Sequence, residues 1–542
     1  MSREPSARER ALRWVRANPG NALLGAAVVA VSAYVIGYPF LVVKYPPITD
    51  LPFHAASTSI LRHYWDPSFG FHKQFTLHLL EVPYVSMYAI GALLALVMPI
   101  DMAVKASAVV MLALLPAGLA VLFHGMKKTP LWGILGLGLV WTNLTHWGFL
   151  NFMGAVGLYA MSVGFALMVV DRPTRGRQWG LALSLLAVFF THIYRFPFAV
   201  LSVAGAAVLM YPATRRIKSI LLPLLPSLAV FGVWRLVRQD NMAMDAKLGL
   251  FPERLKEIRD HVIAGFQGPV GAHEQQLFDQ AQNAFWVVAL VALIWFVAFG
   301  RWRHLESRKL WWGIGVTLLP LILAGGFVLT YLMLPMRIGP WWYVYPREAT
   351  TALFIGLAVV PDMPRAWWLR LPLVALVAVA VSRIGFLVAE QYYDFNKATA
   401  DFQRIEKLVP KDAKLMYLVF DHDGSSRRTT PFIHLPAWIQ AEKGGALSFH
   451  FVGWNHSPIR YRKDDPNVPP PVPDRWEWTP YRFQVLKHGK WFDEFLIRQH
   501  SNPSARLAAD PSIHLVAHEG SWWLYRRVQA PSLNQFREED SR

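Results

Sequence analysis

Two side chains that can carry a proton, Asp50 and His54, follow the first long apolar run of the chain in the stretch YPPITDLPFHAAS (45–57). They are four residues apart, so in a helix they lie one turn apart on the same face. The Asp50 carboxylate is suited to accept the proton of an attacking hydroxyl group as a general base. Asp-Leu-Pro is also a common helix start, where an N-cap aspartate accepts hydrogen bonds from free backbone amides. The sequence leaves both interpretations open.

His54 has two candidate roles beside Asp50. It could orient the carboxylate, or it could bind a divalent metal ion together with it. Two ligands do not make a metal site, so further histidines would have to complete one after folding. The histidines available for this are His63, His72, His78, His146 and His192. The alternative is that these histidines lie at the membrane interface and bond to the backbone or to lipid headgroups.

Two arginines, Arg337 and Arg347, flank the aromatic run WWYVYP in PMRIGPWWYVYPRE (335–348). A guanidinium group pairs with phosphate in a fork geometry and stabilises charge on a phosphate leaving group. We expect Glu348 to hold Arg347 in place. Trp341 and Tyr343 fit either a sugar-stacking platform or an aromatic belt at the membrane interface. Anchoring to lipid headgroups is the alternative role for the arginines.

Two further short segments carry candidate binding residues. THIYR (191–195) contains His192 and Arg195, and we take Arg195 as a second phosphate-binding candidate, with snorkelling towards the interface as the alternative. TNLTHWGFLN (142–151) contains His146 and Asn151. These two side chains could line a cavity, although ordinary turn residues between two helices explain the pattern as well.

Apolar runs dominate the first 390 residues. The chain has 542 residues, 54% of them hydrophobic, which exceeds the share usual in soluble domains. Since a helix crosses a bilayer in about 20 residues, we expect a polytopic α-helical membrane protein with about 11 transmembrane helices. The run at 83–99 is short and bounded by prolines, and we expect it to lie at the interface without crossing. The runs lie at 21–43, 83–99, 103–124, 131–147, 150–170, 179–193, 196–212, 219–236, 284–300, 310–334, 349–361 and 371–390.

The last part of the chain differs in composition. Segments such as AKLMYLVF, ALSFHFVGW and HLVAHEGSWWLYRR predict strands separated by turns, hence a soluble α+β or β-rich domain. The predicted organisation is a basic cytoplasmic N-terminus (1–20), a transmembrane part (21–390) with a first outer loop and interfacial helices (44–102), and a C-terminal extracytoplasmic domain (391–542).

The charge pattern orients the chain. The formal net charge is +18, and much of the basic excess lies in short loops beside apolar runs, as at Lys127 and Lys128. The positive-inside rule places these loops and the N-terminus on the cytoplasmic side of the membrane, and the C-terminal domain on the outer side. Membrane topology therefore explains the charge, and we expect no nucleic-acid partner. The chain has no cysteine, which excludes disulfides, thiolate metal sites and cysteine nucleophiles.

These features resemble the GT-C superfamily of polyprenyl-phosphate-sugar-dependent glycosyltransferases. The basic tail, one span, an acid at the start of a large outer loop, an interfacial stretch and many further spans carry the resemblance over nearly the whole chain. The DLPFH stretch and GGALSFHF (444–451) are also similar to segments of uncharacterised bacterial membrane proteins. Many GT-C members have paired acids in the first loop, whereas this chain has Asp50 alone.

The resemblance implies a membrane glycosyltransferase that moves a sugar from a polyprenyl-phosphate donor to an extracytoplasmic glycan, lipid or protein, with inversion. Asp50 would be the base and His54 its neighbour, and a divalent metal is a candidate cofactor. The arginines would hold the phosphate. The rival hypothesis is an inactive scaffold subunit that contacts a membrane complex through its C-terminal domain. A transporter ranks last, because the polar residues gather at one boundary and not at the bilayer midplane.

Overall fold

The computed structural model describes residues 7–237, 248–263, 265–299, 306–339, 341–422, 430–454, 457–463, 465–473 and 475–528. Contacts within the chain divide it into two compact units. Unit 1 comprises residues 1–42, 83–87 and 108–391, and unit 2 comprises residues 43–82, 88–107 and 392–542. The two units are described separately below.

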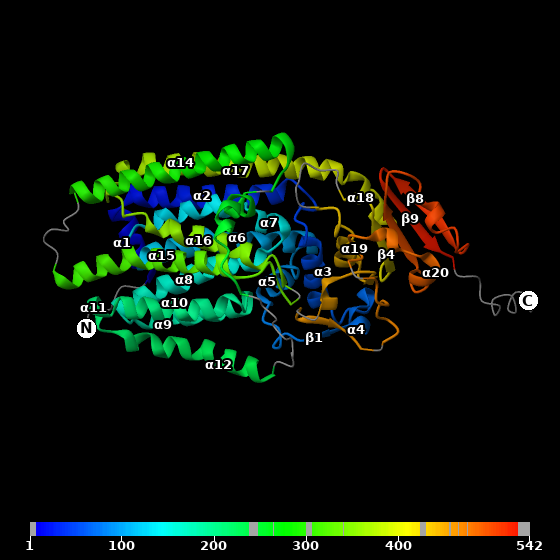
Figure 1. Ribbon diagram of the computed structural model, residues 1–542, viewed down its shortest axis with the longest axis horizontal. Helices are drawn as coiled ribbons and strands as arrows, with labels where there is room; N and C mark the ends of the chain where they lie inside the picture. Colours follow the sequence, from blue (N-terminus) through cyan, green and yellow to red (C-terminus); the bar gives the residue numbers. More distant parts are fainter. Residues whose placement is uncertain are drawn as a thin grey trace, which may run out of the picture. The chain divides into compact units, whose positions relative to one another are not determined.

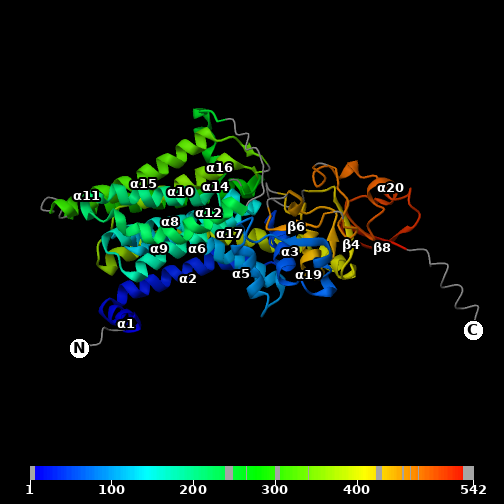
Figure 2. The ribbon, with the colours of Figure 1, turned by 90° about the horizontal axis from the view of Figure 1, so that it is seen from below.

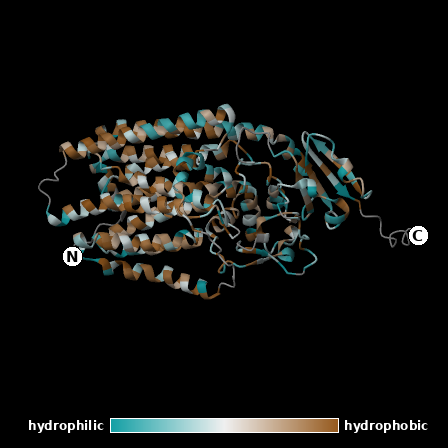
Figure 3. Ribbon diagram, viewed as in Figure 1, coloured by the Kyte–Doolittle hydropathy of each residue, from teal (hydrophilic) through white to brown (hydrophobic). Residues whose placement is uncertain are grey.

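Unit 1 is helical, and its long helices run alongside one another in both ribbon views (Figure 1, Figure 2). Hydrophobic residues cover most of their length (Figure 3). Its principal helices are α1 (Ala7–Ala17), α2 (Pro19–Leu41), α6 (Ile100–Gly125), α8 (Leu150–Asp171), α9 (Arg175–Thr191), α10 (Arg195–Leu209), α12 (Leu221–Val237), α14 (Gly268–Phe299), α15 (Ser307–Met333), α16 (Val344–Gly356) and α17 (Trp367–Ala398). Its short elements are η2 (Pro130–Leu139), α7 (Asn143–Trp147), α11 (Tyr211–Thr214), η3 (Ile217–Ile220), η4 (Pro252–Glu257), α13 (Ile258–Val262), β2 (Arg337–Ile338), β3 (Trp341–Trp342) and η6 (Leu357–Val359).

Within the described residues, seven helices are long and apolar enough to cross a membrane: Pro19–Leu41, Ile100–Gly125, Leu150–Asp171, Ile217–Val237, Gly268–Phe299, Ser307–Met333 and Trp367–Ala398. Other predicted spans form shorter elements. The run at 131–147 breaks into η2 and α7, and the run at 349–361 is divided between the end of α16, a helix of 13 residues in all, and η6. The run at 83–99 forms α5 (Ser86–Leu94), whose nine residues span about 14 Å and are too short to cross a bilayer.

Glycine allows α6 and α8 to pack with their backbones in contact. A Cβ atom added to Gly118 would lie 1.9 Å from the Gly157 carbonyl oxygen, and one added to Gly125 would lie 2.4 Å from the Gly164 carbonyl oxygen. Both pairs are seven residues apart on their helices, so they recur on one face. Small residues at such positions are typical of helix packing in membranes.

Unit 2 combines the first loop with the C-terminal part of the chain. Its first-loop elements are α3 (Leu51–Arg62), η1 (Pro67–Phe69), α4 (Phe71–Gln74) and β1 (Phe75–Leu77). The C-terminal elements are α18 (Ala400–Ile405), η7 (Glu406–Leu408), β4 (Lys414–Val419), α19 (Ala437–Lys443), β5 (Ala446–Leu447), η8 (Phe451–Trp454), β6 (Ile459–Tyr461), η9 (Pro480–Arg482), α20 (Val485–His488), β7 (Glu494–Arg498), η10 (Ser504–Arg506), β8 (Ile513–Glu519) and β9 (Trp522–Arg527).

A five-stranded mixed sheet, in the order β5-β4-β7-β9-β8, forms the core of the C-terminal part. β4 pairs in parallel with β5 and β7, and β9 pairs antiparallel with β7 and β8. The first loop also contributes to the sheet structure, because β1 pairs antiparallel with β6. The α+β character predicted for the tail is therefore present, with the first loop built into the same unit.

Candidate functional site

Asp50 occupies the N-cap position of α3, but its side chain caps nothing. The residue has φ −92° and ψ −4°, and its carboxylate makes no hydrogen bond to the amides of the first turn. Its Oδ1 atom lies 3.1 Å from Nδ1 of His434 instead. The Asp50 side chain is 31% exposed, whereas that of His434 is 10% exposed. The carboxylate thus faces a buried imidazole on one side and remains accessible on the other.

The burial of α3 determines where Asp50 is held. The first ten residues of this helix, LPFHAASTSI, are small or apolar except for His54, which lets the helix be enclosed on most sides. The side chains of α3 with no exposed surface are Leu51, Phe53, Ala55, Ala56, Ser57, Thr58, Ser59 and Ile60. The helix packs against α19 from the C-terminal part of the chain. Pro52 in the first turn favours the helix start at this point.

A second histidine, His450, packs on the other side of Phe53. The Phe53 ring centroid lies 4.3 Å from that of His434 and 4.9 Å from that of His450. The Val452 amide donates a hydrogen bond to His450 Nδ1 at 3.1 Å, so the imidazole proton must be on Nε2. Burial and, to a smaller extent, charge repulsion from His434 and His54 together lower the pKa of His450 to about 3. His450 is therefore neutral at physiological pH.

His54 has a different partner from the one the sequence suggested. Its Nδ1 atom lies 3.0 Å from the Tyr88 hydroxyl group, and its ring lies 5.6 Å from that of Phe451. Across the part of the chain that the structure describes, no three His, Cys, Asp or Glu side chains are grouped so as to hold a metal ion. Among the other first-loop histidines, His63 stacks on Phe69 at 4.0 Å and His78 contacts Glu81 at 2.9 Å.

In unit 1, Arg195 is the centre of a buried ion pair. Its two terminal nitrogens each donate a hydrogen bond of 3.0 Å to the Glu348 carboxylate, and one also donates to the Thr351 hydroxyl at 3.2 Å. Both side chains are more than 90% buried. We had expected Glu348 to hold Arg347, but the structure pairs it with Arg195. This pairing neutralises Arg195 within the helix bundle.

Arg347 interacts differently. Its Nε donates to the Tyr343 carbonyl oxygen at 3.1 Å, and Nη2 donates to that of Trp342 at 2.9 Å. The guanidinium group lies 4.2 Å from the centre of the Phe149 ring. These contacts hold the group without a carboxylate among them. Arg337, the other arginine of this loop, is exposed and bonds to the Gly339 carbonyl oxygen at 2.8 Å.

The other predicted residues of unit 1 gather around the same turns. Tyr343 accepts a hydrogen bond from the Asn143 amide at 2.8 Å, and Trp341 lies edge-on to Tyr194 at 4.6 Å. His146 and Asn151 are buried. The segments 142–151, 192–195 and 337–348, far apart in the sequence, are therefore neighbours in unit 1.

His192 lies in the turn between α9 and α10, where its Nε2 atom is 2.9 Å from the Tyr84 hydroxyl group. Its ring also packs edge-on against Phe152 at 5.3 Å, so both a hydrogen bond and an aromatic contact hold this imidazole in the turn.

His434 and His261 were missed in the sequence. His434 contacts the Thr49–Asp50 segment, although it comes 385 residues after Thr49 in the sequence. His261 lies in α13 and its Nδ1 atom is 3.0 Å from the Tyr343 hydroxyl group. No spacing rule connects residues so far apart in the sequence, and the strand-like segments of the tail indicated only that it would fold compactly.

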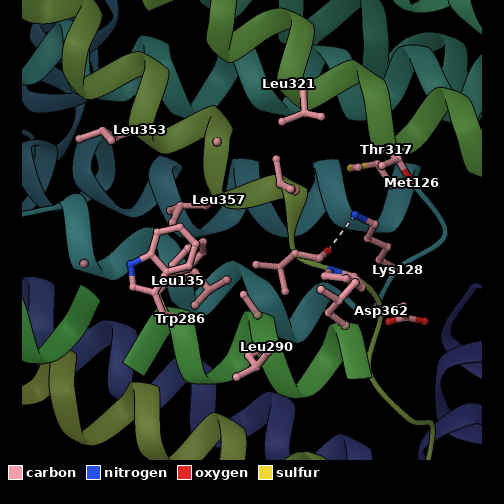
Figure 4. A pocket seen from close by; sticks show the side chains of 18 of the residues that line it. Met126, Lys128, Leu135, Trp286, Leu290, Thr317, Leu321, Leu353, Leu357 and Asp362 are labelled. Atoms are coloured by element: carbon pink, nitrogen blue, oxygen red, sulfur yellow. Dashed lines mark hydrogen bonds between the residues drawn. The ribbon is translucent and has the colours of Figure 1, made fainter. Parts of the chain in front are cut away.

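An apolar cavity of 1390 Å³ lies within unit 1 between α14, α15, α16 and α17 (Figure 4). Trp286, Leu290, Leu321 and Leu353 are among its walls. Lys128 and Asp362 lie at one end, where Lys128 donates to the carbonyl oxygens of Ala358 and Val360 at 2.9 and 2.8 Å. The volume exceeds the range of about 300–1,000 Å³ that is usual for small-molecule pockets.

Comparison with known proteins identifies the fold. The structure is similar to ArnT from Cupriavidus metallidurans bound to undecaprenyl phosphate, with a TM-score of 0.52 and 14% identity over 93% of this chain and 98% of that one. For ArnT in the apo state, the TM-score is 0.53 and the identity 11%, over 96% of this chain and 98% of that one. No family model and no curated protein sequence matches the chain. The chain therefore shares the fold of these two structures, and the predicted polytopic helical architecture with a sheet-containing C-terminal part is confirmed.

The neutral state of His450 predicts a pH dependence of stability. The folded protein keeps this imidazole deprotonated down to a pH of about 3, whereas the unfolded chain protonates it near its usual pKa. The unfolded state therefore binds the extra proton at acidic pH, and stability falls as the pH is lowered below about 6.5. One proton corresponds to about 1.4 kcal/mol per pH unit, or about 2 kcal/mol between pH 6.5 and 5.

Denaturant unfolding of the purified protein in detergent at these two pH values measures this loss. His450→Asn keeps an acceptor for the Val452 amide but removes the titrating group, so it should lose less stability on acidification than the wild type. Equal losses in the two proteins would contradict this assignment of His450.

Proposed function

We propose that this protein is a membrane glycosyltransferase that takes a sugar from a polyprenyl-phosphate donor, with Asp50 as the general base. The carboxylate lies at the start of the first loop, is partly accessible, and makes no capping bond to α3. This observation carries the proposal, because a carboxylate that was only structural would satisfy the helix amides. The similarity to a protein crystallised with undecaprenyl phosphate supports the donor class.

The proposed reaction is a single displacement. The oxygen of an acceptor hydroxyl group attacks the anomeric carbon of the sugar, while its proton passes to the Asp50 carboxylate. The bond between the anomeric carbon and the phosphate oxygen breaks, and its electron pair leaves with the polyprenyl phosphate. Attack opposite the leaving group inverts the anomeric configuration. A glycan, lipid or protein on the extracytoplasmic side would be the acceptor, in an inner membrane with the N-terminus cytoplasmic.

Arg347 is the arginine of unit 1 that best fits the phosphate. Arg195 is bound on both terminal nitrogens by Glu348, so it has little capacity for a second anion. Two carbonyl oxygens and an aromatic ring orient the guanidinium group of Arg347. Such a cation stabilises the negative charge that develops on the leaving phosphate.

The apolar cavity fits a long hydrocarbon chain. Along α14 its walls extend from Phe278 to Phe296, which is about 27 Å of helix and close to the thickness of a bilayer core. We assign it to the lipid chain of the donor. Ala352 and Gly356 line the cavity and lie on a different face of α16 from Arg347. Substitutions in the cavity and at Arg347 therefore test the binding of the lipid chain and of the phosphate separately.

Asp50→Asn should abolish most transfer while the protein still folds, because asparagine cannot accept the proton. We expect kcat to fall about 10²- to 10⁴-fold, the usual contribution of a general base. The measurement is release of undecaprenyl phosphate from a panel of undecaprenyl-phosphoryl pentoses and hexoses, with envelope glycans and lipids as acceptors.

The matched control is Asp66→Asn, in the same loop, where the carboxylate accepts from the Ser68 amide at 3.0 Å and asparagine can do the same. It should transfer like the wild type. A fully active Asp50→Asn protein would refute the role of Asp50. A wild-type protein that releases nothing from any donor would favour the scaffold alternative, in which the C-terminal part serves as an interaction module.

Arg347→Gln should weaken the binding of undecaprenyl phosphate about tenfold or more, since a charge-assisted contact contributes about 1.5–3 kcal/mol. Arg195→Gln should instead lower stability by about 3–5 kcal/mol, because it leaves Glu348 buried without a partner. Titration of each variant with undecaprenyl phosphate, together with thermal unfolding, separates the two effects. If Arg347→Gln bound the lipid as tightly as the wild type, the phosphate would have to be held elsewhere.

Gly313→Leu should obstruct the cavity. Gly313 lines it, and an added Cβ atom would meet nothing within 4 Å, so the larger side chain can project into the space without a clash. Gly232→Leu is the matched control, because Gly232 of α12 is equally open but is not among the cavity walls. We expect Gly313→Leu alone to raise the dissociation constant for undecaprenyl phosphate. Equal binding by the two variants would place the lipid chain outside the cavity.

A further inference from the structure

The protonation of His434 can be deduced from its contacts. Nδ1 lies 3.2 Å from the Thr49 carbonyl oxygen, with which it makes a hydrogen bond, and 3.1 Å from Oδ1 of Asp50. A carbonyl oxygen can only accept, so the proton must reside on Nδ1. The same N–H group therefore points between the backbone oxygen of residue 49 and the carboxylate of residue 50.

The surroundings of His434 hold the ring in this orientation. The ring packs against Phe53 at 4.3 Å and Phe449 at 6.4 Å, and the residue as a whole is only 8% exposed. Its Nε2 atom is buried and has no hydrogen-bond partner among the described residues. Among the described residues, the ring of His434 is therefore oriented by its packing against the two phenylalanines and by the contacts of Nδ1. Together these contacts direct the Nδ1–H group towards the Thr49–Asp50 segment.

We propose that His434 is the positioning residue of Asp50 and fixes the direction of the carboxylate through the Nδ1–H group. The proposal rests on the function proposed above. An N–H donor beside a carboxylate stabilises the charged form, which is the form that accepts a proton. His434 acts through Asp50 and needs no contact with the sugar or the phosphate.

The neighbouring titratable groups do not supply this interaction. His54 bonds to Tyr88 through Nδ1, and His450 is neutral, with Nδ1 taken by the Val452 amide. Thr49 contributes only its carbonyl oxygen to His434. Among the ion-pair contacts shown by the described residues, Asp50 has His434 as its partner.

Three substitutions distinguish the effect of the Nδ1–H donor of His434 from the effect of its ring. His434→Asn places an amide N–H near the position of Nδ1, His434→Gln places one near Nε2, and His434→Phe keeps the ring shape without a donor. His450→Asn is the control for disturbing the same packed group. All are compared as full-length protein in the undecaprenyl-phosphoryl sugar panel, by measuring kcat and KM.

We expect His434→Phe and His434→Gln to lower kcat about 10²-fold, with KM for the donor little changed. His434→Asn should restore most of the rate, and His450→Asn should leave both kcat and KM unchanged.

Wild-type kcat and KM in His434→Phe would overturn the inference while leaving the proposed function intact. It would also be overturned if His434→Asn lost as much as His434→Phe, because the ring and not the donor would then matter. If His434→Phe failed to fold, the comparison of His434→Asn with His434→Gln would still decide. A wild-type protein without transfer activity would overturn both the inference and the proposed function.

Discussion

The burial of α3 against the C-terminal part of unit 2 is the constraint on which the placement of Asp50 depends. A first loop that left the membrane as a flexible segment would allow its carboxylate to sample many positions. Here the helix has eight side chains with no exposed surface, and it packs against α19. Fixing such a helix removes the conformational freedom that a catalytic group would otherwise lose during the reaction. The fold thus restricts Asp50 before any substrate binds.

Arg195 and Arg347 are held in unit 1 by different kinds of contact. Arg195 and Glu348 satisfy each other inside the helices, and removing either would leave the other buried without compensation. Arg347 is oriented by backbone oxygens and an aromatic ring. Two arginines that lie far apart in the sequence but in neighbouring segments of unit 1 therefore differ in their surroundings.

The sequence predicted the features that depend on composition and local pattern. Apolar runs indicated a helical membrane part, and alternating segments near 413–420 and 514–527 predicted strands that the structure contains as β4, β8 and β9. The length of the apolar run at 131–147 predicted a membrane-spanning helix, but the structure has the short η2 there. Pro130 and the glycines at 133, 136 and 138 disfavour a continuous helix. Asp50 could be singled out by its position in the sequence. Whether its side chain caps α3 could not be predicted, and the observed side-chain contacts show that it does not.

Partners brought together by tertiary folding could not be predicted in the same way. Glu348 is adjacent to Arg347 in sequence, which suggested that they pair, yet the helical twist directs Glu348 towards α10 and Arg195. His434 reaches Asp50 only because α3 and the tail form one unit. Side-chain direction on a helix and the packing of distant segments decide such contacts, and neither is visible in a single sequence.

The coupling between residues 50 and 434 tests the central claim most directly. A double-mutant cycle would compare Asp50→Asn, His434→Phe and the double variant by kcat/KM for an undecaprenyl-phosphoryl sugar. If the imidazole acts only through the carboxylate, the double variant should be no slower than Asp50→Asn alone. If the fold losses in kcat/KM of the two single variants multiplied in the double variant, His434 and Asp50 would act independently. The account of a carboxylate base positioned by a buried histidine would then be wrong.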